Sequence, residues 1–171
     1  MNKGKITIGN VCFLLDKKNN TVLLLERLRE PMKDMLTGVG GKTNFEEDIY
    51  DSCVREVKEE TGFDARNLQL KGIVKTILEG HDSSWILFVY TCSDFIGEQI
   101  VCPEGDLKWV DISQIYDVNL IGFIKEILPF VLNENAMIEG TIKHDMEGKV
   151  LKKTIRSIES EQVGASETCC Q

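Results

Sequence analysis

Closely spaced glutamates surround a single arginine in residues 41–63, at intervals suited to holding a metal ion. Glu56, Glu59 and Glu60 stand at positions i, i+3 and i+4, so a helix would project all three carboxylates from one face. Carboxylates at that separation repel one another, and a bound cation would relieve the repulsion. Oxygen ligands alone favour Mg2+, Mn2+ or Ca2+ over zinc. The spacing therefore predicts a hard-metal site built on a helix.

An acidic helix face is usually only a solvated surface, so the glutamates alone are weak evidence for a metal site. Here, however, they belong to a longer pattern. The segment follows the form G-x5-E-x7-R-E-U-x-E-E-x-G-U, where U is a bulky apolar residue. The defined positions are filled by Gly41, Glu47, Arg55, Glu56, Val57, Glu59, Glu60, Gly62 and Phe63. This string resembles the Nudix box, and the chain is similar to the Nudix hydrolase family at every defined position of that motif.

The resemblance implies a set of metal ligands. Nudix hydrolases cleave a nucleoside diphosphate linked to another group, using metal ions that neutralise the phosphates and activate water. Carried over by position, Glu59 and Glu60 should bind the metal directly, and Glu56 should be a further ligand or the base that takes a proton from water. The family also uses a backbone carbonyl at the start of the box, here that of Gly40 or Gly41. The implied cofactor is Mg2+, with Mn2+ as an alternative.

Two further roles follow from the same resemblance. Arg55 and Glu47 should pair with one another and hold the loop against the helix, which is support and not chemistry. The MutT-like branch adds a distant carboxylate just before a Trp-containing strand, and Glu104 has that place ahead of Trp109. The alternative reading of Glu104 is a solvated loop residue beside a turn glycine, and we favour the metal or base role.

Cations on either side of the glycine-rich residues 38–41 are candidates for binding phosphate. Arg27 precedes these glycines and Lys42 follows them, while Arg29 competes with Arg27 for the first position. For each of them the alternative is an ordinary surface charge.

Residues that would contact a base are less sharply indicated. Thr37 and Asn119, or the neighbouring Asp117, stand in segments that carry base contacts in the MutT-like branch. A threonine hydroxyl lacks the paired donor and acceptor of an amide. Base specificity is therefore left open by these residues.

The substrate class rests on which markers are present. The proline typical of ADP-ribose enzymes and the tyrosine typical of diadenosine polyphosphate enzymes are both missing from residues 76–81. The leading prediction is a Mg2+-dependent pyrophosphohydrolase that converts an oxidised purine dNTP, such as 8-oxo-dGTP, to the monophosphate. The alternatives are a Nudix hydrolase of another nucleoside diphosphate derivative and a non-catalytic module that senses a nucleotide. His81 and His144 are interpreted as surface or packed residues.

The elements that must position this chemistry follow from periodicity. The apolar repeat in residues 47–61 predicts a helix from Glu47 to Thr61. Ile49, Cys53 and Val57 form a stripe on it that faces the core. A second helix is predicted over residues 120–132, kinked or divided by its proline, and a helix start at 111–115. Strands are predicted at 5–15, 21–26, 73–78, 85–92, 107–110, 137–143 and 149–156, with a loop at 28–37. This order favours an α/β fold with a mixed sheet covered on both faces, which the resemblance sharpens to the Nudix α/β/α sandwich and its loop-helix-loop.

The whole chain sets the remaining limits. Its 171 residues suit one domain, predicted over 1–157, followed by a loose tail over 158–171. A net charge of -8 argues against long nucleic acids as partners but not against a small nucleotide accompanied by a cation. No apolar run is long enough to cross a membrane and no secretion signal is recognisable, so a cytoplasmic location is expected. The six cysteines lack metal-ligand spacing and predict free thiols, and nothing in the sequence specifies the oligomeric state.

Overall fold

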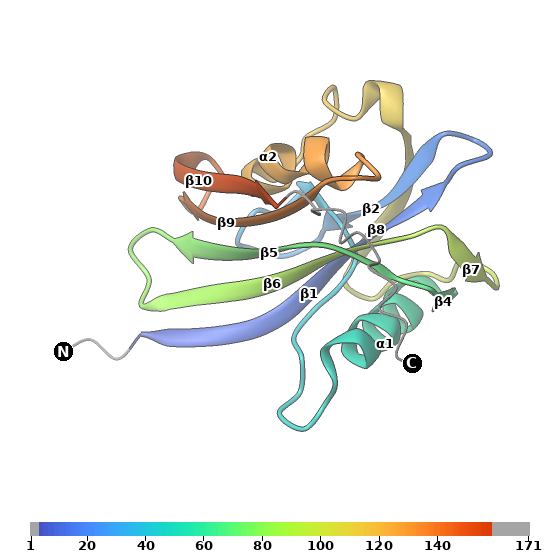
Figure 1. The fold of residues 1–171 in the computed structure, drawn as a ribbon, viewed down its shortest axis with the longest axis horizontal. Coiled ribbons are helices and arrows are strands. Elements are labelled where there is room, and N and C mark those ends of the chain that lie inside the picture. Colours follow the sequence, from blue (N-terminus) through green and yellow to red (C-terminus); the bar gives the residue numbers. More distant parts are fainter. Residues whose placement is uncertain (1–3, 159–171) are drawn as a thin grey trace, which may run out of the picture.

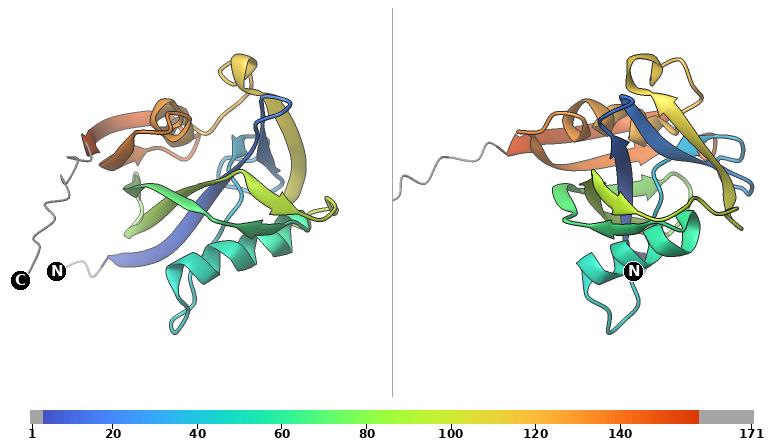
Figure 2. Two further views of the ribbon diagram at one scale, coloured as in Figure 1. Left: turned by 45° about the vertical axis from the view of Figure 1, so that its right-hand side comes forward. Right: turned by 90° about the vertical axis from the view of Figure 1, so that its right-hand side faces the viewer.

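The computed structural model describes residues 4–158, which form a large mixed β-sheet with a helix on each side (Figures 1 and 2). The helices are α1 (Ile49–Thr61) and α2 (Gly122–Val131), with a short 3-10 turn η1 (Ile112–Gln114). The strands are β1 (Lys5–Asp16), β2 (Thr21–Arg27), β3 (Leu36–Thr37), β4 (Asp64–Arg66), β5 (Gln69–Leu78), β6 (Ser83–Cys92), β7 (Asp94–Ile96), β8 (Gly105–Asp111), β9 (Met137–His144) and β10 (Val150–Ile158).

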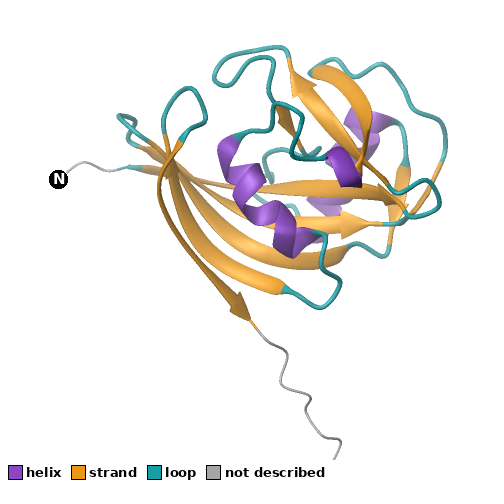
Figure 3. Cartoon of the chain, turned by 90° about the horizontal axis from the view of Figure 1, so that it is seen from above, coloured by secondary structure: helices purple, strands orange, loops and turns teal. Residues whose placement is uncertain are grey.

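The main sheet has the strand order β10-β9-β5-β6-β1-β2-β3, and β8 also pairs with β2. The β1–β6 and β5–β9 pairs are parallel, whereas the other pairs are antiparallel. Seen from above, the long strands fan out across the molecule (Figure 3). β4 and β7 form a separate two-stranded sheet beside α1.

Both faces of the central strands are buried. Along β1, Val11 and Phe13 join the apolar cluster that includes α2, whereas Cys12 and Leu14 join the cluster that includes α1. Successive side chains of a strand point to opposite faces, so a strand covered on both faces reads as a continuous apolar run. Figure 1 shows α1 below and α2 above these strands. The predicted sandwich around a mixed sheet is confirmed.

The glycine-rich loop is fastened along β1 by backbone hydrogen bonds. The amide of Cys12 donates to the carbonyl of Val39 at 2.6 Å, and the amide of Asn10 donates to the carbonyl of Gly41 at 2.9 Å. The loop therefore lies beside the central strand, where it can position the residues that follow it.

The predicted strands are all present, each longer than expected by one to four residues, whereas the short strands β4 and β7 were not expected and several details differ. Helix α1 begins at Ile49 and not at Glu47, because Asp48 accepts hydrogen bonds from the first helical amides and so precedes the helix. Pro129 does not divide α2, which continues to Val131; its missing N–H removes only one helical bond, and only two helical residues follow it. The expected loop at 28–37 ends in the short strand β3, and the helix start at 111–115 is only the turn η1.

Other expectations have mixed outcomes. Cys12, Cys53 and Cys92 are free and buried, as predicted for thiols in apolar stretches, and Cys102 is free and buried as well. Strand β10 includes Ile158, and the rest of the predicted tail lies outside the described residues. Within residues 4–158, neither helix has the length and apolarity to span a bilayer.

Candidate active site

Helix α1 has well-defined ends. At its start the Asp48 carboxylate accepts hydrogen bonds from the amides of Tyr50 at 2.8 Å and Asp51 at 3.3 Å, which satisfies donors that the helix leaves unpaired. At its end Gly62 adopts a left-handed conformation with φ of 82°, and a Cβ there would lie 2.5 Å from the Glu98 carbonyl oxygen. Both ends fix the position of the glutamates between them.

Arg55 connects three glutamate carboxylates, one of them in the loop before α1. Its Nε and Nη2 donate to the two oxygens of Glu47 at 2.6 and 2.9 Å, a bidentate pair that ties the loop to the helix. Its Nη1 donates to Glu56 at 2.9 Å and to Glu59 at 3.2 Å. Hydrogen bonding to Arg55 lowers the pKa of Glu47 to about 2. The Arg55–Glu47 pair implied by the sequence is present, and Arg55 also partly neutralises the acidic helix face.

Glu60 is the most buried of these carboxylates, with 4% of its surface exposed. Burial raises its pKa to about 8, and the nearby Glu104, Glu56 and Glu59 add to the effect. The Gly40 amide opposes it by donating to Glu60 Oε2 at 2.7 Å. Burial also raises the pKa of Glu56. These carboxylates are held where a neighbouring cation would stabilise their charged forms.

The absence of side chains at two glycines is required here. Gly40 has a φ of 141°, and a Cβ there would lie 2.4 Å from the Asn10 carbonyl oxygen. A Cβ on Gly41 would lie 2.6 Å from the Glu56 carboxylate. The loop backbone therefore touches both β1 and the acidic face of α1.

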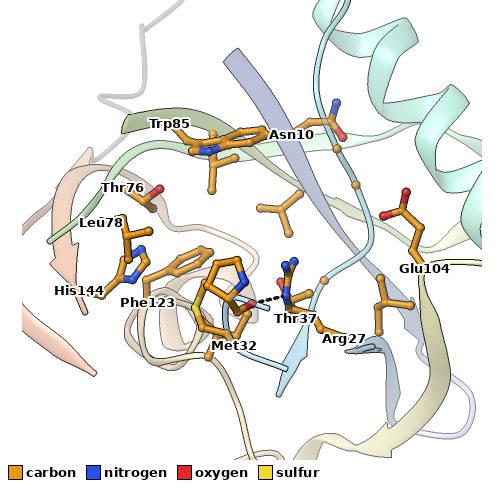
Figure 4. A pocket seen from close by; sticks show the side chains of 18 of the residues that line it. Asn10, Arg27, Met32, Thr37, Thr76, Leu78, Trp85, Glu104, Phe123 and His144 are labelled. Carbon is orange, nitrogen blue, oxygen red and sulfur yellow. Dashed lines mark hydrogen bonds between the residues drawn. The ribbon is translucent and has the colours of Figure 1, made fainter. Parts of the chain in front are cut away.

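A cavity of about 290 Å³ opens beside this loop (Figure 4). Glu60 and Glu104 line it together with the glycine loop, and we call this the acidic end. Trp85, Phe123 and His144 line it as well, and we call this the aromatic end. Apolar side chains of Leu78, Leu87 and Ile121 contribute to the wall, and Arg27, Thr37, Thr76 and Asn10 add polar groups.

The residues predicted for the site separate into two groups. The cavity is lined by Gly41, Glu60, Glu104, Arg27 and Thr37, which come from five different segments of the chain. The lining does not include Glu56, Glu59, Lys42 or Asn119. Of these, Glu56 has its carboxylate against the backbone of Gly41, and Glu59 is largely exposed on α1. The Asn119 amide donates to the Asp34 carbonyl at 3.1 Å, so its base contact has no support from this arrangement.

Several residues that line the cavity are not among the predicted site residues. The sequence places Asn10, Trp85 and Phe123 in strands or a helix without a site role, and it predicts His144 to be a packed or surface residue. His144 is packed, with 4% of its surface exposed, but it also borders the cavity. Its only sequence signal was a polar residue at the end of an alternating strand.

The donors at the acidic end fit a hard cation by type, since all are carboxylate or carbonyl oxygens. Within residues 4–158, however, no three His, Cys, Asp or Glu side chains converge as a formed metal site. Arg55 accounts for part of this, because it holds one oxygen of Glu56 and one of Glu59. The Gly41 carbonyl likewise accepts a hydrogen bond from Asn10.

A family model described as NUDIX domain matches residues 6–130. The chain belongs to the NUDIX domain family. It is 30% identical over 137 residues to the uncharacterized Nudix hydrolase YvcI of Bacillus subtilis (strain 168), covering 78% of this chain and 85% of that protein.

Solved Nudix structures share the fold. A MutT protein from Bacillus halodurans superposes with a TM-score of 0.78 at 28% identity, covering 87% of this chain and 97% of the other. A MutT Nudix hydrolase from Burkholderia pseudomallei gives 0.66 at 23% identity, covering 74% and 98%. The chain is thus a Nudix hydrolase of the MutT type, and α1 with its preceding loop is its Nudix box.

Proposed function

We propose that this Nudix protein is a Mg2+-dependent nucleoside triphosphate pyrophosphohydrolase, and that oxidised purine dNTPs such as 8-oxo-dGTP are its preferred substrates. The products are the nucleoside monophosphate and pyrophosphate. One observation carries the proposal: a single cavity has an acidic end beside the Nudix glutamates and an aromatic end further along. A nucleotide has the same division, with an anionic chain that needs a cation and a flat base that packs on aromatic rings. The similarity to MutT proteins supports this choice.

Mg2+ would be held by Glu56, Glu59, Glu60 and Glu104, together with the carbonyl of Gly41 or Gly40. Bound there, it would neutralise phosphate oxygens and lower the pKa of the attacking water. The raised pKa of the buried Glu60 supports this assignment, because a cation offsets the cost of charging a buried carboxylate.

The side chains of the protein would do the rest. Arg27 lines the cavity, and its Nε donates to the Pro31 carbonyl at 3.0 Å, which orients the guanidinium. We assign this cation to the phosphates of the substrate. Glu104 lines the cavity close enough to raise the pKa of Glu60, and it is our candidate for the group that takes the proton of water. Gly40 and Gly41 let the substrate approach the loop backbone. We assign Lys42 and Thr37 secondary contacts with the substrate and place the reaction in the cytoplasm.

A substrate panel tests the proposal. The protein is incubated with Mg2+ and 8-oxo-dGTP, dGTP, dATP, ADP-ribose or a diadenosine polyphosphate, and the products are separated by ion-exchange chromatography. We expect preferential cleavage of 8-oxo-dGTP with release of pyrophosphate. Cleavage of ADP-ribose or the diadenosine compound alone would indicate another Nudix hydrolase activity. Absence of cleavage across the whole panel would favour a nucleotide-sensing module.

A further inference from the structure

His144 is held rigidly at the aromatic end of the cavity. It is the last residue of β9, and its backbone carbonyl accepts a hydrogen bond from the Glu79 amide at 2.8 Å. Its ring stacks on Phe123 with centroids 5.8 Å apart and planes inclined by 28°. Figure 4 shows the imidazole beside Phe123 and Leu78 at the cavity wall. A buried polar ring fixed in this way is suited to recognising a ligand through a hydrogen bond.

The hydrogen bond of the ring determines which nitrogen is free. His144 Nδ1 lies 3.0 Å from the backbone oxygen of Asp145. A carbonyl oxygen only accepts hydrogen bonds, so Nδ1 must carry the proton and donate it. In the neutral ring Nε2 is then an acceptor. The Asp145 carbonyl is itself held in the β9–β10 turn, where it accepts from the Gly148 amide at 3.2 Å.

The other polar groups that line the cavity differ from this imidazole in charge or in hydrogen-bonding capacity. The two carboxylates that line the cavity, Glu60 and Glu104, belong to the acidic end. Thr76 contributes a hydroxyl, which can donate or accept, and Trp85 contributes an indole N–H, which only donates. His144 lines the same cavity, so a base that packs among the aromatic rings would lie against an imidazole whose remaining polar atom, Nε2, is an acceptor.

We propose that His144 determines base specificity by accepting a hydrogen bond from the N7–H of an 8-oxopurine. In an unoxidised purine N7 has no hydrogen and is an acceptor. It would face the lone pair of Nε2, and two buried acceptors would be left without a donor. A site built around such a bond rejects the analogue that lacks the hydrogen far more strongly than an apolar wall does. This inference rests on the proposed function and names the residue that selects its substrate.

The test compares two substitutions that divide the roles of the ring. His144→Asn keeps an amide donor near the Nδ1 position and removes the acceptor, whereas His144→Gln places an amide oxygen near Nε2. For His144→Asn we expect the ratio of kcat/KM for 8-oxo-dGTP to that for dGTP to fall about tenfold, mainly through KM. His144→Gln should keep part of the ratio. Hydrolysis of dCTP, whose base offers no N7, reports the loss of ring packing alone, so in His144→Asn it should fall by less than that of 8-oxo-dGTP.

A binding cycle separates this inference from the proposed function. The monophosphates of 8-oxodeoxyguanosine and of its N7-methyl derivative are titrated into wild type and His144→Asn by calorimetry. Methylation should weaken binding to wild type about tenfold and leave the variant nearly unchanged. Equal losses in both proteins, or equal loss of all substrates in His144→Asn, would overturn the role of His144 and mark it as structural. Failure of the wild type to cleave any triphosphate would overturn the proposed function, whatever this cycle shows.

Discussion

The glutamates of the Nudix box differ in acidity because each meets a different environment. Glu47 is paired with Arg55 and its pKa falls to about 2, whereas burial raises the pKa of Glu60 to about 8. Glu59 is largely exposed on the same helix face. Residue type and spacing therefore identify the set, while burial and partners divide the roles within it.

The raised pKa of Glu60 predicts how the stability of the metal-free protein varies with pH. A carboxyl that binds its proton more tightly in the folded state stabilises the fold fully below its ordinary pKa of 4.5. That contribution is lost as pH rises towards about 8, and its size is on the order of 4 kcal/mol. In EDTA, thermal unfolding of wild type should shift to lower temperature between pH 5 and 8. Glu60→Gln should reduce the shift, because its amide does not ionise.

The control for this prediction is Glu46→Gln, which removes the same charge from an exposed residue of the preceding loop. It should unfold with the pH dependence of wild type. An unaltered slope in Glu60→Gln would show that Glu60 titrates normally in the folded protein.

Glu104 tests the catalytic assignment. Since it lines the cavity near Glu60, Glu104→Gln should lower kcat by about a hundredfold, whereas KM should change by less than about threefold. Steady-state kinetics with Mg2+ measure both. Glu98→Gln is the matched control, with the same charge change at an exposed position of the β7–β8 connection. A kcat for Glu104→Gln close to that of wild type would assign Glu104 to the solvated loop.

At the scale of elements, what the sequence could predict depended on how local the signal was. Helix α1 was recognisable because its apolar stripe and its glycine stop lie within the segment itself. The short strands β3, β4 and β7 were missed because each has two or three residues, too few for a periodic pattern, and forms only by pairing with distant strands. His144 is packed as predicted, but its place beside the cavity was not expected for a related reason: it depends on β5, β9 and α2 packing together, which no local pattern encodes.

The N-cap of α1 offers a prediction at this scale. Asp48→Ala removes the acceptor for the amides of Tyr50 and Asp51, and should lower the free energy of unfolding by about 1 kcal/mol. Urea denaturation followed by circular dichroism measures it. Asp51→Ala removes a charge from the same turn without removing the cap and should cost less than about 0.5 kcal/mol. Equal losses would attribute the effect to charge and not to capping.

At the scale of the molecule, the protein must bind a nucleotide although both carry a net negative charge. The chain carries a net charge of -8, and a Mg2+–nucleoside triphosphate complex is also anionic. Association of like charges is slowed by their repulsion, and salt screens that repulsion over roughly 10 Å at 0.1 M. Arg27 lines the cavity, where its proposed contact with bound substrate would contribute little to attraction at long range.

The activity should therefore increase with added salt. At fixed free Mg2+, raising NaCl from about 20 to 150 mM should raise kcat/KM for the preferred triphosphate roughly two- to threefold, with kcat nearly constant. Potassium acetate at the same ionic strength should act alike, which separates screening from chloride binding. A fall in kcat/KM with both salts would mean that local cations, Arg27 first among them, outweigh the net charge during encounter. Arg27→Gln would then remove the fall.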